Sequence, residues 1–310
     1  MLQVNDLHKK FKTTTAVNGV NLYLDQGESV GLLGPNGAGK STTISMISTL
    51  LQPTSGDIRF KGGDVFKKPD VIRPVLGVVP QEIALYEELT AYENMHFFGK
   101  TYGLSGEKLK NKIDEVLELV GLTDRKKERV KNYSGGMKRR INIAVSLMHE
   151  PELLIMDEPT VGIDPQSRSH ILEMVRELNR KKGMSILYTS HYMEEVERLC
   201  DRVYIMDHGQ IIASGTKEEL KSILSSEDTI LIEVHQKSEQ FIDQLNEHSL
   251  VQQIAEVDTG YKVIVSKGAD VFADIFEIAN ASQVKVKGVH VQTPTLEDVF
   301  LHLTGRKLRD

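Results

Sequence analysis

One short segment combines glycines, a lysine and a serine at the spacing that phosphate binding requires. Gly34-Pro35-Asn36-Gly37-Ala38-Gly39-Lys40-Ser41 fits the pattern G-x-x-x-x-G-K-[ST]. In such a loop the glycines let consecutive backbone N–H groups point into one concavity, and the N-terminus of the next helix adds partial positive charge. Lys40 is expected to reach the β- and γ-phosphates, and the Ser41 hydroxyl to be a ligand of Mg²⁺. The segment predicts nucleotide binding without saying which class of hydrolase this is.

A second group of reactive side chains follows an apolar run, 153–156, in the middle of the chain. Asp157 and Glu158 come directly after it, and buried strands rarely end in two acids without a cation to neutralise them. Asp157 can hold Mg²⁺, and Glu158 can polarise a water for in-line attack on the γ-phosphate. His191 follows the next predicted strand, 184–189, which would place it near that phosphate. A histidine at a strand end can equally be structural.

Three further candidates have ordinary structural explanations when each is taken alone. Gln81 ends a predicted buried strand, so its side-chain carbonyl could face the metal and the water, or it is a surface residue. Phe11 could stack on a purine ring, or it is a core or edge aromatic. Ser134, with Gly135 and Gly136, exposes backbone amides at the start of a helix, or it is simply the helix cap.

Two other patterns are set aside because of where they fall. The basic run Lys138–Arg140 is expected on the solvated face of a helix. Asn111-Lys112-Ile113-Asp114 imitates the guanine-recognition pattern N-K-x-D, which needs a loop after a strand. Here it falls inside a predicted amphipathic helix, 105–121, with Ile113 on the apolar face. We therefore do not expect specificity for GTP.

Hydrophobic periodicity predicts the elements that hold these residues. Ser29–Leu33 is expected to be a buried strand before the phosphate loop, and 41–51 a helix after it. Residues 2–7 and 20–24 alternate in hydrophobicity and predict an antiparallel edge sheet, while 85–99 is expected to be mostly helical. Further strands are predicted over 58–60, 76–79, 203–206 and 211–212, and further helices over 138–149 and 166–181.

The pattern changes after residues 224–228. Strand, helix, two strands, helix and strand then follow, which is the β-α-β-β-α-β order of ferredoxin-like domains. Thr293 is expected to cap a last helix that begins at Pro294. This part contains no catalytic constellation. The strands are predicted over 229–234, 251–257, 261–265 and 284–291, and the helices over 238–244 and 270–279.

Composition narrows the class of protein. The chain has 310 residues, 40% of them hydrophobic and 26% charged, which is typical of a globular protein with room for two units. The net charge of −6 argues against a protein that binds nucleic acid by neutralising phosphates. The only cysteine, Cys200, excludes a disulfide framework. Without a secretory signal in Met1–Lys12 or an apolar run of about 20 residues, we expect a cytosolic protein.

Taken together, the order and spacing of these motifs resemble the ABC ATPases over residues 1 to about 220. The resemblance implies an α/β P-loop NTPase fold with an antiparallel β edge subdomain, a helical subdomain at about 85–150, and ATP and Mg²⁺ as cofactors. The signature segment, Tyr133–Met137, departs from the usual Leu-Ser-Gly-Gly-Gln at its first and last positions. Contacts of the usual glutamine are therefore not carried over to Met137. By resemblance, the catalytic residues are Glu158, His191, Gln81 and Lys40, the metal ligands are Ser41, Gln81 and Asp157, and nucleotide contacts come from Phe11, Gly34–Thr42, Ser134–Gly136 and Asp164.

The end of the chain, with Thr-Pro-Thr-Leu-Glu-Asp-Val-Phe at 293–300, resembles the accessory domain of the daunorubicin-resistance-like exporters. This resemblance implies an ABC ATP-binding domain over 1–222 and a small α+β ferredoxin-like domain over 223–310. The small domain could support dimerisation or regulate hydrolysis, or it is a stabilising appendage.

The family resemblance also implies partners. Two copies would form a homodimer through ATP, with Ser134 and Gly136 of one copy contacting nucleotide held by Lys40 of the other. The dimer would drive drug export through integral-membrane permease subunits from the cytoplasmic face of the membrane, with residues 81–99 as the lever. Two alternatives stay open: a membrane-associated sensor module, and a soluble ABC ATPase of translation or DNA repair. The second usually carries two cassettes or a coiled-coil insertion, and neither is present here.

Overall fold

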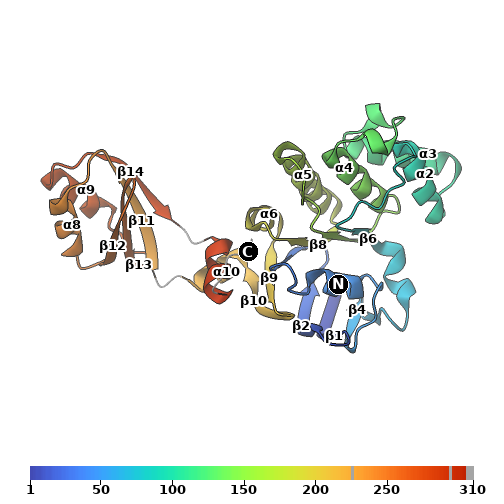
Figure 1. Ribbon diagram of the computed structural model, residues 1–310, viewed down its shortest axis with the longest axis horizontal. Helices are drawn as coiled ribbons and strands as arrows, with labels where there is room; N and C mark the ends of the chain where they lie inside the picture. Colours follow the sequence, from blue (N-terminus) through green and yellow to red (C-terminus); the bar gives the residue numbers. More distant parts are fainter. Residues whose placement is uncertain (225–226, 293–294, 305–310) are drawn as a thin grey trace. The chain divides into compact units, whose positions relative to one another are not determined.

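In the computed structural model, a six-stranded sheet of order β10-β9-β3-β8-β7-β6 carries the candidate residues at its strand ends (Figure 1). Strands β3 (Ser29–Leu33), β7 (Leu153–Asp157) and β8 (Ser185–Ser190) are buried along their whole length and run parallel. Continuous apolar runs are what strands covered on both faces require. The other strands are β6 (Leu76–Val79), β9 (Arg202–Asp207) and β10 (Gln210–Thr216). Strands β6 and β9 run parallel to β7 and β3, and β10 runs antiparallel to β9.

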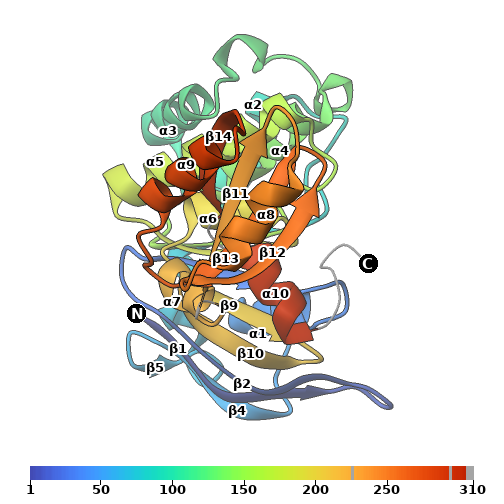
Figure 2. The same ribbon diagram turned by 90° about the vertical axis from the view of Figure 1, so that its left-hand side faces the viewer.

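A second, antiparallel sheet of order β2-β1-β4-β5 lies at the edge of the same unit (Figure 2). Helix α1 (Lys40–Ile47) contributes to the apolar core that this sheet shares with β3 and β7. The predicted edge sheet is therefore confirmed, with longer strands than the alternation indicated. They are β1 (Leu2–Lys10), β2 (Thr15–Leu24), β4 (Ser55–Phe60) and β5 (Gly63–Asp64).

Helices α2 (Ala91–Thr101), α3 (Gly106–Leu119) and α4 (Gly135–Ser146) form the helical part of this unit (Figure 1). The mostly helical segment predicted over 85–99 is confirmed from Ala91 onward, whereas 85–90 is a loop. The buried Asn94 side chain accepts the N–H of Tyr86 and donates to its carbonyl, and this pairing replaces helical hydrogen bonds. Helix α4 also begins earlier than predicted, at Gly135.

Two more helices complete the unit. Helix α5 (Pro165–Lys182) packs against α4 and α6, and α6 (Met193–Leu199) packs against β3 and β8. Helix α7 (Lys217–Ser222) begins where the chain divides, because the first unit comprises Met1–Lys217 and the second begins at Glu218. Single 3₁₀ turns occur at Pro69–Val71, Arg73–Val75, Thr123–Arg125 and Val130–Asn132.

The second unit is a four-stranded antiparallel sheet of order β12-β13-β11-β14 with two helices on one face. This is the predicted ferredoxin-like order. Its apolar core joins side chains of both helices to alternate residues of the strands. The elements are β11 (Glu227–Val234), α8 (Glu239–Asn246), β12 (Val251–Val257), β13 (Gly260–Ser266), α9 (Phe272–Ala281), β14 (Val286–Gln292) and α10 (Leu296–Thr304).

The structure describes residues 1–224, 227–292 and 295–304. The predicted cap Thr293 and helix-opening Pro294 lie outside these ranges. Within them, no helix combines the length and the hydropathy needed to cross a bilayer.

Candidate functional site

The phosphate loop forms one wall of a cleft of about 390 Å³ in the first unit. The cleft lies between the start of α1 and the ends of β6 and β7, so three segments that are distant in sequence meet there. Its lining residues are Ala16, Asn36, Gly37, Ala38, Gly39, Lys40, Ser41, Thr42, Gln81 and Glu158.

Two glycines of the loop have no room for a side chain. A Cβ on Gly34 would lie 2.3 Å from the Met206 carbonyl oxygen, and one on Gly39 would lie 2.4 Å from that of Ala16. Gly39 also has φ of 105°, which L-residues rarely adopt. The loop therefore depends on these glycines for its shape as well as for access to its N–H groups.

Lys40 lies under the loop with only 4% of its surface exposed. Its ammonium donates to the carbonyl oxygens of Gly34 at 2.7 Å and Pro35 at 3.1 Å, and it pairs with Glu158 Oε1 at 3.2 Å. The contacts with the two carbonyls are hydrogen bonds, and the contact with Glu158 is an ion pair. A phosphate oxygen that reached Lys40 would compete with Glu158 for the positive charge.

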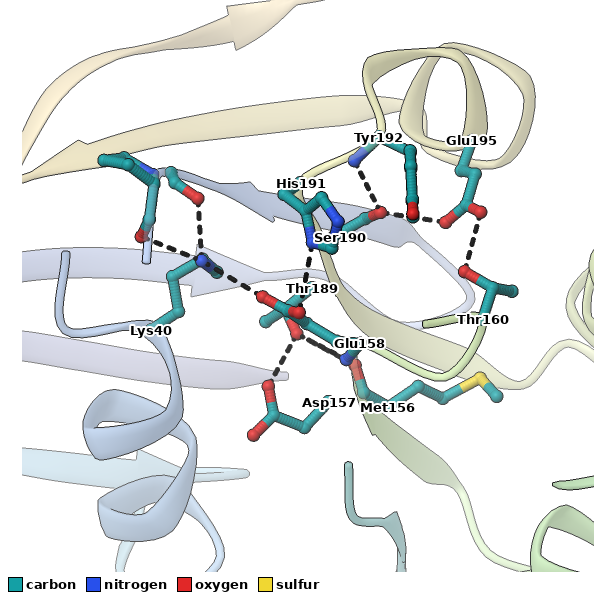
Figure 3. Close-up of polar contacts among 12 residues, drawn as sticks. Lys40, Met156, Asp157, Glu158, Thr160, Thr189, Ser190, His191, Tyr192 and Glu195 are labelled. Carbon is teal, nitrogen blue, oxygen red and sulfur yellow. Dashed lines mark hydrogen bonds and ion pairs between the residues drawn. The ribbon is translucent and has the colours of Figure 1, made fainter. Parts of the chain in front are cut away.

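The neighbouring strand β8 holds the Asp157 carboxylate and the Glu158 backbone at the end of β7 (Figure 3). Thr189 Oγ1 donates to Asp157 Oδ1 at 2.8 Å and accepts the Glu158 N–H at 2.9 Å. Glu158 has φ of 45°, a left-handed conformation that is uncommon for a residue with a side chain. Its second oxygen, Oε2, lies 3.1 Å from Nδ1 of His191. Glu158 thus contacts both Lys40 and His191. Thr189 is not among the site residues predicted from the sequence.

The basic run at the start of α4 is not a solvated face, which corrects the sequence-based expectation for Arg139. This guanidinium is buried and donates to the carbonyl oxygen of Pro80 at 2.6 Å and to that of Gln81. Burial lowers the pKa of Arg139. Asn142, one turn further along α4, accepts the N–H of Ala84 at 3.2 Å. Helix α4 therefore holds the turn that brings Gln81 to the cleft.

The signature segment and Asp164 lie together but do not line this cleft. Ser134 caps α4 by accepting the Met137 N–H at 3.3 Å. A Cβ on Gly136 would lie 2.2 Å from Ser167 Oγ and 3.4 Å from Asp164 Oδ2, so the two helix starts touch. Asp164 caps α5, and the Ser167 N–H lowers the pKa of its carboxyl. The residues that line the cleft and the signature segment with Asp164 thus form two separate groups within one copy.

Phe11 also lies outside the lining of the cleft. Its ring is 46% exposed at the turn between β1 and β2, and the Lys9 ammonium lies 5.3 Å from the ring centre. A core role for Phe11 is excluded by this exposure, and an aromatic platform or an ordinary edge residue both remain compatible with it.

The donor set around the cleft contains no all-protein metal cage. Among the described residues, no three His, Cys, Asp or Glu side chains converge on one point. Mg²⁺ usually keeps one or two protein carboxylates and takes its other oxygens from phosphates and water. One carboxylate, Asp157, with the hydroxyl of Ser41 and the amide of Gln81, fits that requirement.

Comparisons with known proteins agree with this geometry. The "ABC transporter" family model matches residues 17–161, and the model of the "ATP-binding protein DrrA1-3-like, C-terminal domain" matches 215–304. The linearmycin resistance ATP-binding protein LnrL of Bacillus subtilis (strain 168) is 50% identical over 312 residues, covering 100% of both chains. The daunorubicin resistance ATP-binding protein DrrA3 of Streptomyces coeruleorubidus is 36% identical, covering 98% of this chain and 96% of the relative.

Solved structures support the same assignment. A dimeric ATP-binding cassette in a post-hydrolysis state, bound to ADP and phosphate, matches with a TM-score of 0.65 and 25% identity. The match covers 70% of this chain and 98% of that one. The phosphate loop, the carboxylates at the end of β7 and the full-length relatives therefore lead to one conclusion: this chain is an ABC-type ATPase and belongs to the ATP-binding proteins of ABC transporters, in the group with a DrrA-like C-terminal domain.

Proposed function

We propose that the chain is the motor subunit of an exporter, in which ATP closes two copies into a dimer and hydrolysis lets them part. The exporter would carry a drug or lipophilic antibiotic through separate membrane subunits, with this chain on their cytoplasmic face. The relatives named for linearmycin and daunorubicin resistance support the cargo class. The solved cassette that is dimeric with ADP and phosphate supports the assembly.

The observation that carries the proposal is the separation of the site residues into two groups. Lys40, Gln81 and Glu158 share one cleft, whereas Ser134, Gly136 and Asp164 do not line it. The start of helix α4, where Ser134 precedes Gly135 and Gly136, offers a second anion-binding surface. A second copy related by a two-fold axis would place that surface over the cleft and complete two equal sites.

The contacts around Glu158 suggest how hydrolysis begins. When phosphate oxygens bind Lys40, they compete with the Glu158 carboxylate for its positive charge. Glu158 then keeps its contact with His191 at 3.1 Å and has an oxygen available to accept a proton from water. The imidazole Nδ1 donates to Glu158, which leaves Nε2 as the polar atom that can meet the γ-phosphate.

We assign the Mg²⁺ ligands to Ser41, Gln81 and Asp157. Bound there, the ion would neutralise charge on the phosphates during transfer. The protein's own contribution is to hold the ligands in place: Thr189 orients Asp157, and Arg139 fixes the backbone of Gln81. Phe11 would stack on the adenine from the β1–β2 turn.

The loop after Gln81 is the surface we assign to the membrane partner. Tyr86 is 51% exposed and contacts Phe97 edge to face, with ring centres 5.1 Å apart. Ile83 and Leu85 in the same loop are half-buried. Exposed aromatic and apolar groups in one place are typical of interaction surfaces. Since Arg139 ties this loop to α4, a partner that moves it would act on both Gln81 and the signature segment.

Glu158→Gln tests the assembly. The change keeps the size of the side chain and removes the base, so hydrolysis should fall by about 10²–10⁴. The variant should bind ATP and elute as a dimer on a sizing column, with wild-type protein and ADP as the monomeric control. A variant that stays a monomer with ATP would contradict the closed dimer. Co-purification of membrane proteins with the wild type would separate an exporter or sensor from a soluble ATPase.

A further inference from the structure

One buried carboxylate lies beside the reactive residues without belonging to them. Glu195, in the first turn of α6, is 3% exposed, and four side chains converge on it. Thr160 Oγ1 donates to Oε1 at 2.6 Å, and Tyr188 and Ser190 each donate to Oε2 at 2.8 Å. The Arg168 guanidinium Nε lies 3.6 Å from Oε1.

Stability alone is a poor explanation for this arrangement. A buried ionic group must offset its lost hydration, and an apolar replacement of similar volume is often equally stable. Burial, and then Glu195, raise the pKa of Tyr188, so its phenol stays a hydrogen-bond donor. A carboxylate with several directional partners fixes the segments that supply them, which an apolar side chain does not.

The partners of Glu195 lie next to the two residues assigned to hydrolysis (Figure 3). Ser190 precedes His191, and the Ser190 hydroxyl also accepts the N–H of Tyr192 at 2.9 Å, so both neighbours of His191 are fixed to the same carboxylate. Thr160 follows Glu158 by two residues on the other side. Glu195 thus joins the His191 turn to the segment after Glu158.

We propose that Glu195 is a positioning residue for ATP hydrolysis, which holds His191 within hydrogen-bond distance of Glu158. It does not touch the reacting atoms and acts through its hydroxyl partners. The proposal rests on the roles assigned above to Glu158 and His191.

Glu195→Gln is the first test. A carboxamide has one acceptor oxygen and an NH₂ group that only donates, so it cannot serve three hydroxyl donors. We expect kcat for ATP hydrolysis to fall by at least about tenfold, while KM for ATP changes by less than about twofold, because the phosphate loop is untouched. Glu194→Gln is the matched control: it makes the same charge change one residue earlier, at an exposed position, and should leave kcat unchanged.

A double-mutant cycle separates positioning from general support of the fold. If Glu195 acts through His191, adding Glu195→Gln to His191→Ala should lower kcat by less than about twofold further. A purely structural role would give the same fold-loss in both backgrounds and would overturn the proposal. Wild-type kcat in Glu195→Gln would also overturn it.

Ser190→Ala keeps the proposal testable if Glu195→Gln does not fold. It removes the single hydroxyl that links Glu195 to Tyr192 and should lower kcat by about threefold to tenfold with KM unchanged. Unchanged kcat would count against positioning. Full activity in His191→Ala or Glu158→Gln would instead refute the proposed function itself. If kcat falls in His191→Ala and Glu158→Gln but not in Glu195→Gln or Ser190→Ala, only the inference about Glu195 is refuted.

Discussion

Each of the two units has an apolar core, but among the described residues only the first unit also buries charged side chains. In the first, six charged residues are buried at or near the ends of the strands: Lys40, Arg139, Asp157, Glu158, Glu195 and Asp207. In the second, the buried side chains are apolar among the residues that the structure describes from 218 onward, apart from Ser282.

This difference shows where the chain's chemistry lies. Burying a charge is costly unless it is paired, so a cluster of buried, paired charges marks a place where position matters more than packing. The second unit gains its stability from alternating apolar residues on one face of a sheet. Substitutions in the first unit should therefore change catalysis, and those in the second should change stability.

Lys40→Ala should have the largest effect. It removes the ammonium that would meet the phosphates and leaves Glu158 without its cationic partner. Hydrolysis should fall by roughly 10²–10³, the usual loss when one donor to a developing charge is removed. Steady-state hydrolysis and ATP-analogue binding measure this effect, and circular dichroism checks that the variant is folded. Unchanged turnover would show that the buried charge of Lys40 in the first unit is not needed for hydrolysis.

Ile232→Ala in β11 should lower stability and leave hydrolysis nearly unchanged. The side chain is fully buried in the second core, so its truncation should lower the free energy of unfolding of that unit by about 2–5 kcal/mol. Hydrolysis per folded molecule should stay within about twofold of wild type, because the candidate site residues lie in the first unit. Ile264→Ala on the neighbouring strand, where the residue is half-buried, is the control and should cost less. A large loss of kcat in folded Ile232→Ala would show that the second unit takes part in hydrolysis.

Sequence patterns predicted the strands better than the helices. Continuous apolar runs such as Ser29–Leu33 allow only a buried strand between turns, and the structure has that strand with the same bounds. Residues 85–90 carry apolar side chains at helical spacing, yet they form a loop. Its backbone is paired with Asn94 and with the 130–131 segment, where Val130 N–H donates to the Leu89 carbonyl. Hydrogen bonds to residues outside 85–90 leave no pattern within this segment from which the loop could be predicted.

Site residues that belong to a local motif could be predicted from the sequence. Site residues that are placed only by tertiary packing could not. Lys40 and Glu158 follow from local patterns, and the structure places them 3.2 Å apart. Arg139 cannot be told from its basic neighbours in sequence, because only the position of the Gln81 turn makes it buried. Thr189 could have been found from strand register, since it lies opposite Asp157 in the parallel pair β7–β8.

If each nucleotide is held by two copies of the chain, two variants that are inactive alone should restore hydrolysis when they are mixed. Lys40→Ala leaves the signature segment intact, and Ser134→Arg leaves the phosphate loop intact while blocking closure by its size and charge. Each alone should be nearly inactive. A mixture should regain hydrolysis, because a dimer of one copy of each contains one complete site. A mixture that stays as inactive as its two parts would contradict this, and so would full activity of Ser134→Arg alone.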